Sequence, residues 1–262
     1  MHYETILFDV RDNVAHMALN RPEVANSINA QMTIDLMRAA IQCSEDPDIR
    51  AVLISGTGRM FCSGGDLKEF AAQGKRLPYQ LKEMTTYLHA AISRLARMEA
   101  PVVAAVHGSA AGAGLSLACA CDIVIAAEDT RFTMAYTRVG LVPDGSSTYF
   151  LPRIVGLKRA LELTLTNRIL SAQEALEWGI VNQVVPGEEL MTQAQNLATT
   201  LAAGPTKALG TAKRLLNNSW NESLESQMEY ESQAIASMAR TADTSEGIAA
   251  FLAKRTAKFS GK

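Results

Sequence analysis

Two short glycine-containing segments combine residue types that could stabilise a negatively charged oxygen. The first, Gly108-Ser-Ala-Ala-Gly-Ala-Gly114, follows an apolar, β-branched run at 101–107 and precedes an apolar run suited to a helix. Small residues let another molecule approach the backbone closely, and the first turn of a helix has N–H groups without partners. Such a turn could bind an oxygen that gains negative charge during a reaction.

The second segment, Phe61-Cys-Ser-Gly-Gly-Asp66, follows another apolar run at 51–55. Two turns of this kind in one domain could bind one oxyanion from two sides. Loss of one such donor typically costs roughly 3–4 kcal/mol of transition-state stabilisation. Glycine in these turns could instead serve only the close packing of a helix on a sheet. The glycine spacing matches neither G-x-G-x-x-G nor G-x-x-x-x-G-K-[ST], which argues against a nucleotide site.

The elements that would position the two turns follow from the pattern of apolar residues. Residues 3–19 predict a β-hairpin that turns at Asp12-Asn13, and 28–44 has helical spacing. Between the turns, the pattern predicts a mobile polar loop at 67–78 and a helix at 79–98. Apolar runs predict buried strands at 51–55, 101–107, 123–126 and 180–185.

After Lys158 the helical pattern dominates, and residues 188–258 predict three or four helices. A shift in composition near 190–205 indicates a boundary. We therefore expect an α/β core of repeated β-β-α units over residues 1–195, followed by a helical region over 196–262.

Length and composition exclude several classes of protein. The chain has 262 residues, of which 48% are hydrophobic and 20% charged, and a formal net charge of −2. This balance fits a globular protein and gives no basis for nucleic-acid binding as the main task. No apolar run approaches the length of a membrane span, and no signal-peptide pattern opens the chain, so we expect a cytoplasmic protein. The four cysteines lack the spacing of a disulfide framework or a metal site.

The order of these segments resembles the crotonase superfamily, also called the enoyl-CoA hydratase/isomerase family. Matching features cover essentially the whole chain. In chain order they are Leu19-Asn-Arg-Pro22, Phe61–Asp66, Gly108–Asp122, Gly140-Leu-Val-Pro-Asp144, Leu151-Pro-Arg153, Ala175-x-x-Trp-Gly-Ile-Val181 and Ala250-Phe-Leu-Ala-Lys-Arg255.

The resemblance implies a crotonase (ClpP/crotonase-like) spiral of β-β-α units with a helical C-terminal trimerisation region. It implies an acyl-CoA thioester as substrate, no separate cofactor, no metal, and a homotrimer or a dimer of trimers. It places an oxyanion hole at the backbone N–H groups of Ser63 and Ala113. Residues that the resemblance implies for substrate or CoA binding are Ala25, Gly64, Gly65, Asp66, Leu67, Gly112, Ser116, Phe251 and Lys254. An N-cap before Leu67 is an alternative role for Asp66, and a solvated basic helix face is one for Lys254.

The chain departs from the best-known hydratases, which use two glutamates to position and deprotonate water. Ser116 and Tyr136 stand at those positions. Neither is a carboxylate base near neutral pH, so hydration by that route is not expected.

One carboxylate, Asp144, stands at another catalytic position of the family. Taken alone, Asp144 could be a turn residue before Gly145 or an N-cap. The same position carries the acid/base aspartate of members that resemble 1,2-epoxyphenylacetyl-CoA isomerase. A single carboxylate suffices to move a proton along an activated acyl chain, so the resemblance favours an isomerase with Asp144 as acid/base.

The position of Asp144 also carries the nucleophile of members that resemble 4-chlorobenzoyl-CoA dehalogenase. His89 matches the histidine that activates water there, and Tyr136 replaces a tryptophan. His89 could instead be a packed or surface histidine, or it could pair with Asp144 in isomerisation and, with Tyr136, shape the acyl pocket. Weak hydration, thioester hydrolysis and acyl-CoA binding without catalysis stay open as further alternatives.

Overall fold

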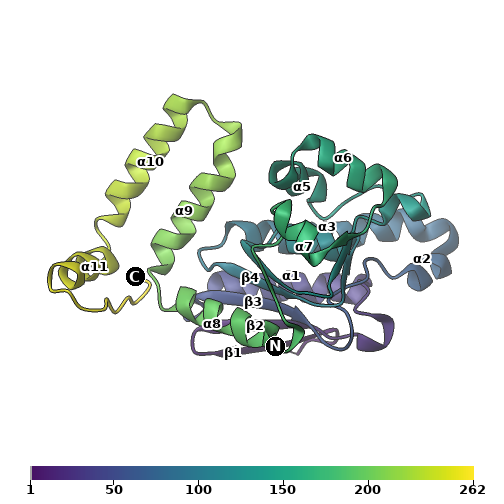
Figure 1. The fold of residues 1–262 in the computed structure, drawn as a ribbon, viewed down its shortest axis with the longest axis horizontal. Coiled ribbons are helices and arrows are strands. Elements are labelled where there is room, and N and C mark those ends of the chain that lie inside the picture. The colour runs from purple at the N-terminus through teal and green to yellow at the C-terminus, as the bar shows by residue number, and fades with distance from the viewer. Residues whose placement is uncertain (1) are drawn as a thin grey trace.

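The computed structural model describes residues 2–262 and places the glycine turns at one end of a six-stranded sheet (Figure 1). The strand order is β1-β2-β3-β4-β6-β9, and all neighbours are parallel except the hairpin β1-β2. The strands are β1 (Ile6–Arg11), β2 (Val14–Leu19), β3 (Ala51–Gly56), β4 (Val102–Val106), β6 (Ile123–Ala127) and β9 (Gln183–Val185). A second sheet contains β5 (Ser109–Ala111), β7 (Arg131–Thr133) and β8 (Leu170–Ser171).

Over residues 2–262, eleven α-helices pack against the main sheet or extend away from it (Figure 1). They are α1 (Ala30–Glu45), α2 (Leu67–Gln73), α3 (Leu77–Arg97), α4 (Ala113–Cys119), α5 (Ser147–Val155), α6 (Leu157–Thr166), α7 (Ala172–Glu177), α8 (Leu190–Ala202), α9 (Thr206–Asn218), α10 (Leu224–Met238) and α11 (Ala242–Leu252). Alternate strand residues point to opposite faces. Val52 and Ile54 join the large core that contains α1 and α3, whereas Ala51 and Leu53 pack with α8.

The predicted hairpin is confirmed. Asp12 and Asn13 both have positive φ, at 51° and 62°, as a two-residue turn between twisted strands requires. The predicted strands at 51–55, 101–107 and 123–126 and the helix at 79–98 are present within a few residues. The stretch at 180–185 forms a strand only over Gln183–Val185.

The prediction of a loop at 67–78 is wrong, because α2 and the start of α3 occupy it. The physical reason is an N-cap: an Asp66 Oδ1 accepts from the backbone N–H groups of Lys68 and Glu69. The Phe70 side chain packs in the large core and so anchors the short helix α2.

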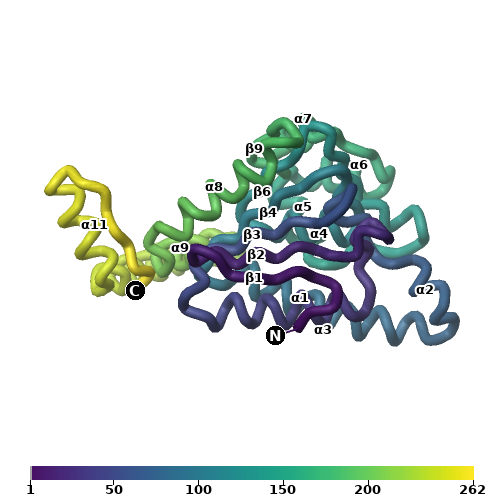
Figure 2. The backbone as a smooth tube through the Cα atoms, turned by 90° about the horizontal axis from the view of Figure 1, so that it is seen from below, coloured from purple at the N-terminus to yellow at the C-terminus, as the bar shows by residue number. Residues whose placement is uncertain are grey.

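The C-terminal part forms the four helices α8 to α11. Figures 1 and 2 show α9, α10 and α11 extending away from the sheet. Helix α8 stays on the sheet through Leu190, Ala194, Ala198 and Ala202. The expected boundary after residue 195 lies inside α8, and the division into two regions stays a prediction. Over residues 2–262, no helix combines the length and apolar character that a membrane span needs.

Candidate active site

The two glycine turns lie against each other through backbone pairing. The Cys62 N–H donates to Ser109 O at 3.1 Å, and the Ala111 N–H donates to Cys62 O at 2.9 Å. Close approach requires glycine at 114, since a Cβ there would lie 2.6 Å from Cys62 O. Burial raises the pKa of the Cys62 thiol to about 12, so this cysteine is no nucleophile.

Two N–H groups in these turns remain available to a ligand. Over residues 2–262, the N–H groups of Gly65 and Ala113 have no hydrogen-bond acceptor in the protein. The Ser63 N–H instead donates to Ala25 O at 3.0 Å. It is thus engaged within the loop, whereas the Gly65 N–H is not, and the role of either group toward a substrate oxygen stays a prediction. Ala25 itself contributes this carbonyl from a left-handed conformation with φ 53°.

Asp66 is buried, and its carboxylate binds groups of the turn rather than facing open solvent. Besides capping α2, its Oδ2 lies 3.0 Å from Arg21 Nη1, which also donates to Ser27 O at 2.6 Å. Burial acts to raise the pKa of Asp66, but the Glu69 N–H and the Arg21 guanidinium outweigh it and hold this pKa below its ordinary value. The N-cap alternative for Asp66 is confirmed, and contact with CoA stays a prediction.

The turns open into a cavity of about 410 Å³, which we call the glycine-turn cavity. Its walls are largely apolar, and they come from α2, α3 and the segment 135–144. Sequence reasoning missed most of these residues, although the apolar face of α3 signalled them. The lining includes Ile28, Gly64, Gly65, Leu67, Phe70, Leu81, Met84, Leu88, Gly112, Ala113, Tyr136, Leu141, Val142 and Asp144.

Asp144 is the only carboxylate among the described residues that line the glycine-turn cavity. A chain of side chains fixes it: the Tyr136 hydroxyl donates to Asp144 Oδ1 at 2.6 Å, and Ser116 Oγ lies 3.0 Å from that hydroxyl. Ser116 is fully buried, and its Oγ donates to Gly112 O at 3.2 Å. This chain links the carboxylate to the turn that presents the Ala113 N–H.

Burial raises the pKa of Tyr136, and the charge of Asp144 raises it further. Tyr136 therefore stays a neutral donor and leaves the negative charge on Asp144. Asp144 is not the N-cap of α5, since Ser146 occupies that position. Its backbone carbonyl accepts from the Ser147 N–H at 3.2 Å, which fixes the turn in front of the helix.

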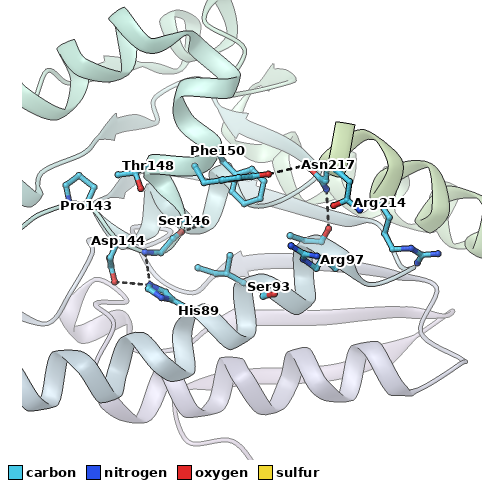
Figure 3. A pocket seen from close by; sticks show the side chains of 15 residues that line it. His89, Ser93, Arg97, Pro143, Asp144, Ser146, Thr148, Phe150, Arg214 and Asn217 are labelled. Carbon is cyan, nitrogen blue, oxygen red and sulfur yellow. Dashed lines mark hydrogen bonds and ion pairs between the residues drawn. The ribbon is translucent and has the colours of Figure 1, made fainter. Parts of the chain in front are cut away.

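His89 lies beside Asp144, with Nε2 3.7 Å from Oδ2 (Figure 3). The Gly145 N–H donates to the same Nε2 at 3.2 Å, so Nε2 acts as a hydrogen-bond acceptor in this arrangement. The His89 side chain is half exposed and that of Asp144 is 28% exposed. A second cavity, of about 520 Å³, begins at this pair; we call it the distal cavity.

The structure thus brings together Asp144, Tyr136, Ala113 and Gly65 around the glycine-turn cavity, with Ser116 behind Tyr136 and His89 next to Asp144. It does not bring Phe251 and Lys254 there. Phe251 is 83% exposed on α11, and neither residue lines the glycine-turn cavity or the distal cavity of its own chain.

Comparisons with known proteins agree with this architecture. Residues 9–262 match the family model described as enoyl-CoA hydratase/isomerase. The chain is 41% identical over 260 residues to 1,2-epoxyphenylacetyl-CoA isomerase of Escherichia coli K12, covering 99% of both chains. It is 36% identical over 246 residues to 4-chlorobenzoyl coenzyme A dehalogenase-2 of an Arthrobacter species, covering 93% of this chain and 88% of the other.

Solved structures give the same result. An enoyl-CoA hydratase from Polaromonas sp. JS666 superposes with a TM-score of 0.93 at 34% identity, covering 97% of this chain and 99% of the other. The enoyl-CoA hydratase of Bacillus anthracis superposes with a TM-score of 0.92 at 33% identity, covering 99% and 100%. The α/β crotonase fold and the C-terminal helices expected from the sequence are confirmed. The chain belongs to the enoyl-CoA hydratase/isomerase family of the crotonase superfamily and is an enzyme of that family.

Proposed function

We propose that the protein is an acyl-CoA isomerase in which Asp144 moves a proton along the acyl group. The observation that carries this proposal is the position of Asp144 and its hydrogen bond. It is the single carboxylate among the described residues of the glycine-turn cavity, and one of its oxygens is held by Tyr136. The relative from Escherichia coli that is named as an isomerase supports the same reaction class.

In this mechanism the thioester carbonyl lies at the N–H groups of Gly65 and Ala113. Asp144 Oδ2 removes a proton from the carbon next to the carbonyl of a 3-enoyl-CoA. The electron pair of that C–H bond forms a double bond to the carbonyl carbon, and the carbonyl π electrons move onto the thioester oxygen, which the two N–H groups stabilise. This dienolate is conjugated with the double bond already present, so its negative charge is shared with the carbon two positions further along. Protonated Asp144 then returns the proton two carbons further along, which moves the double bond to the 2-position and restores the carboxylate.

The neighbours of Asp144 favour isomerisation over hydration. The two residues that stand at the hydratase glutamate positions, Ser116 and Tyr136, hydrogen-bond to each other and hold Asp144. Neither carries a negative charge, since burial raises the pKa of Tyr136. A ring-containing acyl-CoA such as 1,2-epoxyphenylacetyl-CoA, by analogy with the isomerase relative, is a second substrate for the same acid/base aspartate.

A second candidate is a dehalogenase, and the contact between His89 and Asp144 favours it. Asp144 would attack the ring carbon that carries chlorine, and chloride would leave to give an aryl ester. Water would then attack the ester carbonyl and give its proton to His89 Nε2, which releases 4-hydroxybenzoyl-CoA and the carboxylate. The 3.7 Å contact between His89 Nε2 and Asp144 Oδ2 and the relative named as a dehalogenase support this alternative.

The test is product analysis by mass spectrometry with chromatographic separation of isomers. A 3-enoyl-CoA, a 2-enoyl-CoA, 1,2-epoxyphenylacetyl-CoA and 4-chlorobenzoyl-CoA are offered to the wild type and to Asp144→Asn. The proposal expects an isomer of equal mass that depends on Asp144. Exchange of chlorine for hydroxyl establishes the second candidate instead, gain of water a hydratase, and release of free CoA a thioesterase. Binding without turnover of any ester would leave an acyl-CoA-binding protein.

The C-terminal helices support a proposal about assembly, a homotrimer or a dimer of trimers. Large apolar side chains are exposed there, among them Leu216, Trp220, Leu224, Ile235 and Phe251. Burial of such side chains favours association. Light scattering on the purified protein checks this, and a monomer at micromolar concentration contradicts it.

A further inference from the structure

The distal cavity has no role in the proton transfer proposed above. Helix α3, the segment 143–150 and helix α9 enclose it (Figure 3). Asp144 lines both this cavity and the glycine-turn cavity. An acyl group whose thioester lies at the glycine turns and whose reacting carbons lie at Asp144 can therefore continue into the distal cavity. This placement rests on the proposed function.

One wall of the distal cavity is a row of residues on α3. His89, Ser93 and Arg97 are spaced by four residues and so lie on one face of the helix. With a rise of 1.5 Å per residue, Arg97 lies roughly 12 Å beyond His89 along the helix axis. An extended chain advances about 1.2 Å per bond. About ten bonds beyond the reacting carbons cover this distance, so an acyl chain of roughly fourteen carbons reaches from the glycine turns to the level of Arg97.

The middle of the distal cavity suits methylene groups or a ring. Ile92 and Ala96 of α3 are buried, and Phe150 faces them from α5. The Phe150 ring packs edge-on against Tyr149, with ring centroids 5.1 Å apart. The Tyr149 hydroxyl in turn donates to Asn217 O at 3.4 Å, which connects this wall to α9.

The end of the cavity away from Asp144 is basic. Figure 3 shows Arg97 and Arg214 there, opposite Asp144 and His89. Arg214 contacts Thr211 Oγ1 at 3.0 Å and lies 3.8 Å from Glu99 Oε1. Over residues 2–262, Arg97 has no acidic partner within ion-pair distance. Among the described residues, Glu99 is the only acidic residue at ion-pair distance from either guanidinium group, so this end carries an unbalanced positive charge.

The charges of the cavity are thus separated. Among the described lining residues, Asp144 is the only acid, and it lies at the reacting end. A guanidinium binds a carboxylate through two parallel hydrogen bonds, and such charge-assisted bonds are about twice as strong as neutral ones. We propose that the distal cavity receives the far end of the acyl group and that Arg97, with Arg214 beside it, selects acyl chains that end in a carboxylate.

The test uses saturated esters that cannot react, so that it does not depend on turnover. Tetradecanoyl-CoA and tetradecanedioyl-CoA have the same chain length, and only tetradecanedioyl-CoA ends in a carboxylate. By titration calorimetry, the wild type is expected to bind tetradecanedioyl-CoA at least about tenfold more tightly, as one charge-assisted hydrogen bond provides. Arg97→Gln should abolish this preference and change tetradecanoyl-CoA binding by less than about twofold. Arg94→Gln, an exposed arginine of the same helix that does not line the cavity, should leave both affinities unchanged.

Two outcomes overturn the proposal. If Arg97→Gln weakens both esters equally, the arginine binds the phosphates of CoA rather than the acyl terminus. If the wild type binds both esters equally, the distal cavity does not select a carboxylate. A failure of the proposed function looks different: no enoyl-CoA is isomerised, while the preference for tetradecanedioyl-CoA and its dependence on Arg97 persist.

Discussion

The two walls of the glycine-turn cavity are built from different kinds of groups. One wall is backbone: the N–H groups of Gly65 and Ala113, held in place because their loops pair through Cys62 and Ala111. The other wall consists of side chains. There Tyr136 and Asp144 line the cavity, Ser116 contacts Tyr136 from behind, and His89 contacts Asp144 from the side of the distal cavity.

Because of this difference, one wall determines how the thioester is bound and the other determines which reaction follows. The backbone wall requires glycine at positions where a Cβ would collide, and its donors do not depend on other side chains. It can therefore stabilise the oxyanion of any thioester. The side-chain wall determines where protons go, and a single substitution changes it. We therefore expect changes in the side-chain wall to affect turnover alone, and changes in the backbone wall to affect both turnover and folding.

The sharpest test of this separation is Asp144→Asn. The amide keeps the shape of the carboxylate but cannot accept the proton, so kcat should fall by about 10²–10⁴. Binding of a saturated acyl-CoA, measured by calorimetry, should change little. Asp129→Asn, an exposed aspartate on a turn, is the control and should keep full activity. Near-full activity of Asp144→Asn would show that the proton moves elsewhere.

The corresponding change in the backbone wall is Gly114→Ala. Its Cβ would lie 2.6 Å from Cys62 O and 2.7 Å from Cys62 Cβ, so the two turns must move apart. Displacement of one oxyanion donor should lower kcat by about 10²–10³, and thermal unfolding should show a lower Tm. The matched control is Gly187→Ala, where a Cβ meets nothing within 4 Å and φ is not positive. A fully active Gly114→Ala with an unchanged Tm would contradict the role of the paired turns.

The backbone wall was largely predictable from the sequence. Its glycines follow strands that clear apolar runs predict, and the surrounding segments match motifs of the family. The sequence does not reveal that the Ser63 N–H donates to Ala25 O while the Gly65 N–H has no acceptor within residues 2–262. The loop expected at 67–78 is helical for a similar reason. The cap by Asp66 and the burial of Phe70 outweigh a polar composition.

The side-chain wall was predictable only as a set of candidates. The hydrogen bond from Tyr136 to Asp144 spans eight residues, and the contact between Ser116 and Tyr136 spans twenty. Such contacts depend on the path of the chain between them and leave no periodic signal. The short second sheet escaped prediction too, because β5 and β7 have three residues each and β8 has two.

Tyr136→Phe tests the support of Asp144 rather than the carboxylate itself. Loss of the 2.6 Å hydrogen bond should lower kcat by about tenfold, the value of one hydrogen bond to a charged group. A free tyrosine ionises with a pKa of about 10. Because burial raises the pKa of Tyr136, its hydroxyl should remain protonated and still donate its hydrogen bond at that pH. The wild-type pH–rate profile should therefore show no loss from tyrosine ionisation between about pH 8 and 10. A wild-type decline there that disappears in Tyr136→Phe would contradict this account.

The smallest effect on turnover is expected for Asp66→Asn, which weakens the support of the backbone wall. Asp66 joins Arg21 to the start of α2, and its neutral replacement should lower the free energy of unfolding by about 1–3 kcal/mol. The kcat should fall less than about threefold, since one charge-assisted contact is lost outside the cavity. Urea unfolding near neutral pH measures the stability difference, and Asp129→Asn again serves as the control.

The pH dependence of that difference distinguishes the charge of Asp66 from its shape. The pKa of Asp66 is lower in the folded protein than in the unfolded chain, where an aspartate ionises at about 3.9. The stabilisation is therefore complete above that value and is lost as the pH falls through the folded-state pKa. The gap between wild type and Asp66→Asn should stay constant from neutral pH to about pH 5 and narrow below about pH 4. A gap that persists unchanged into acid would mean that the substitution acts by altered packing, and the ion pair with Arg21 would then contribute nothing to holding the turn.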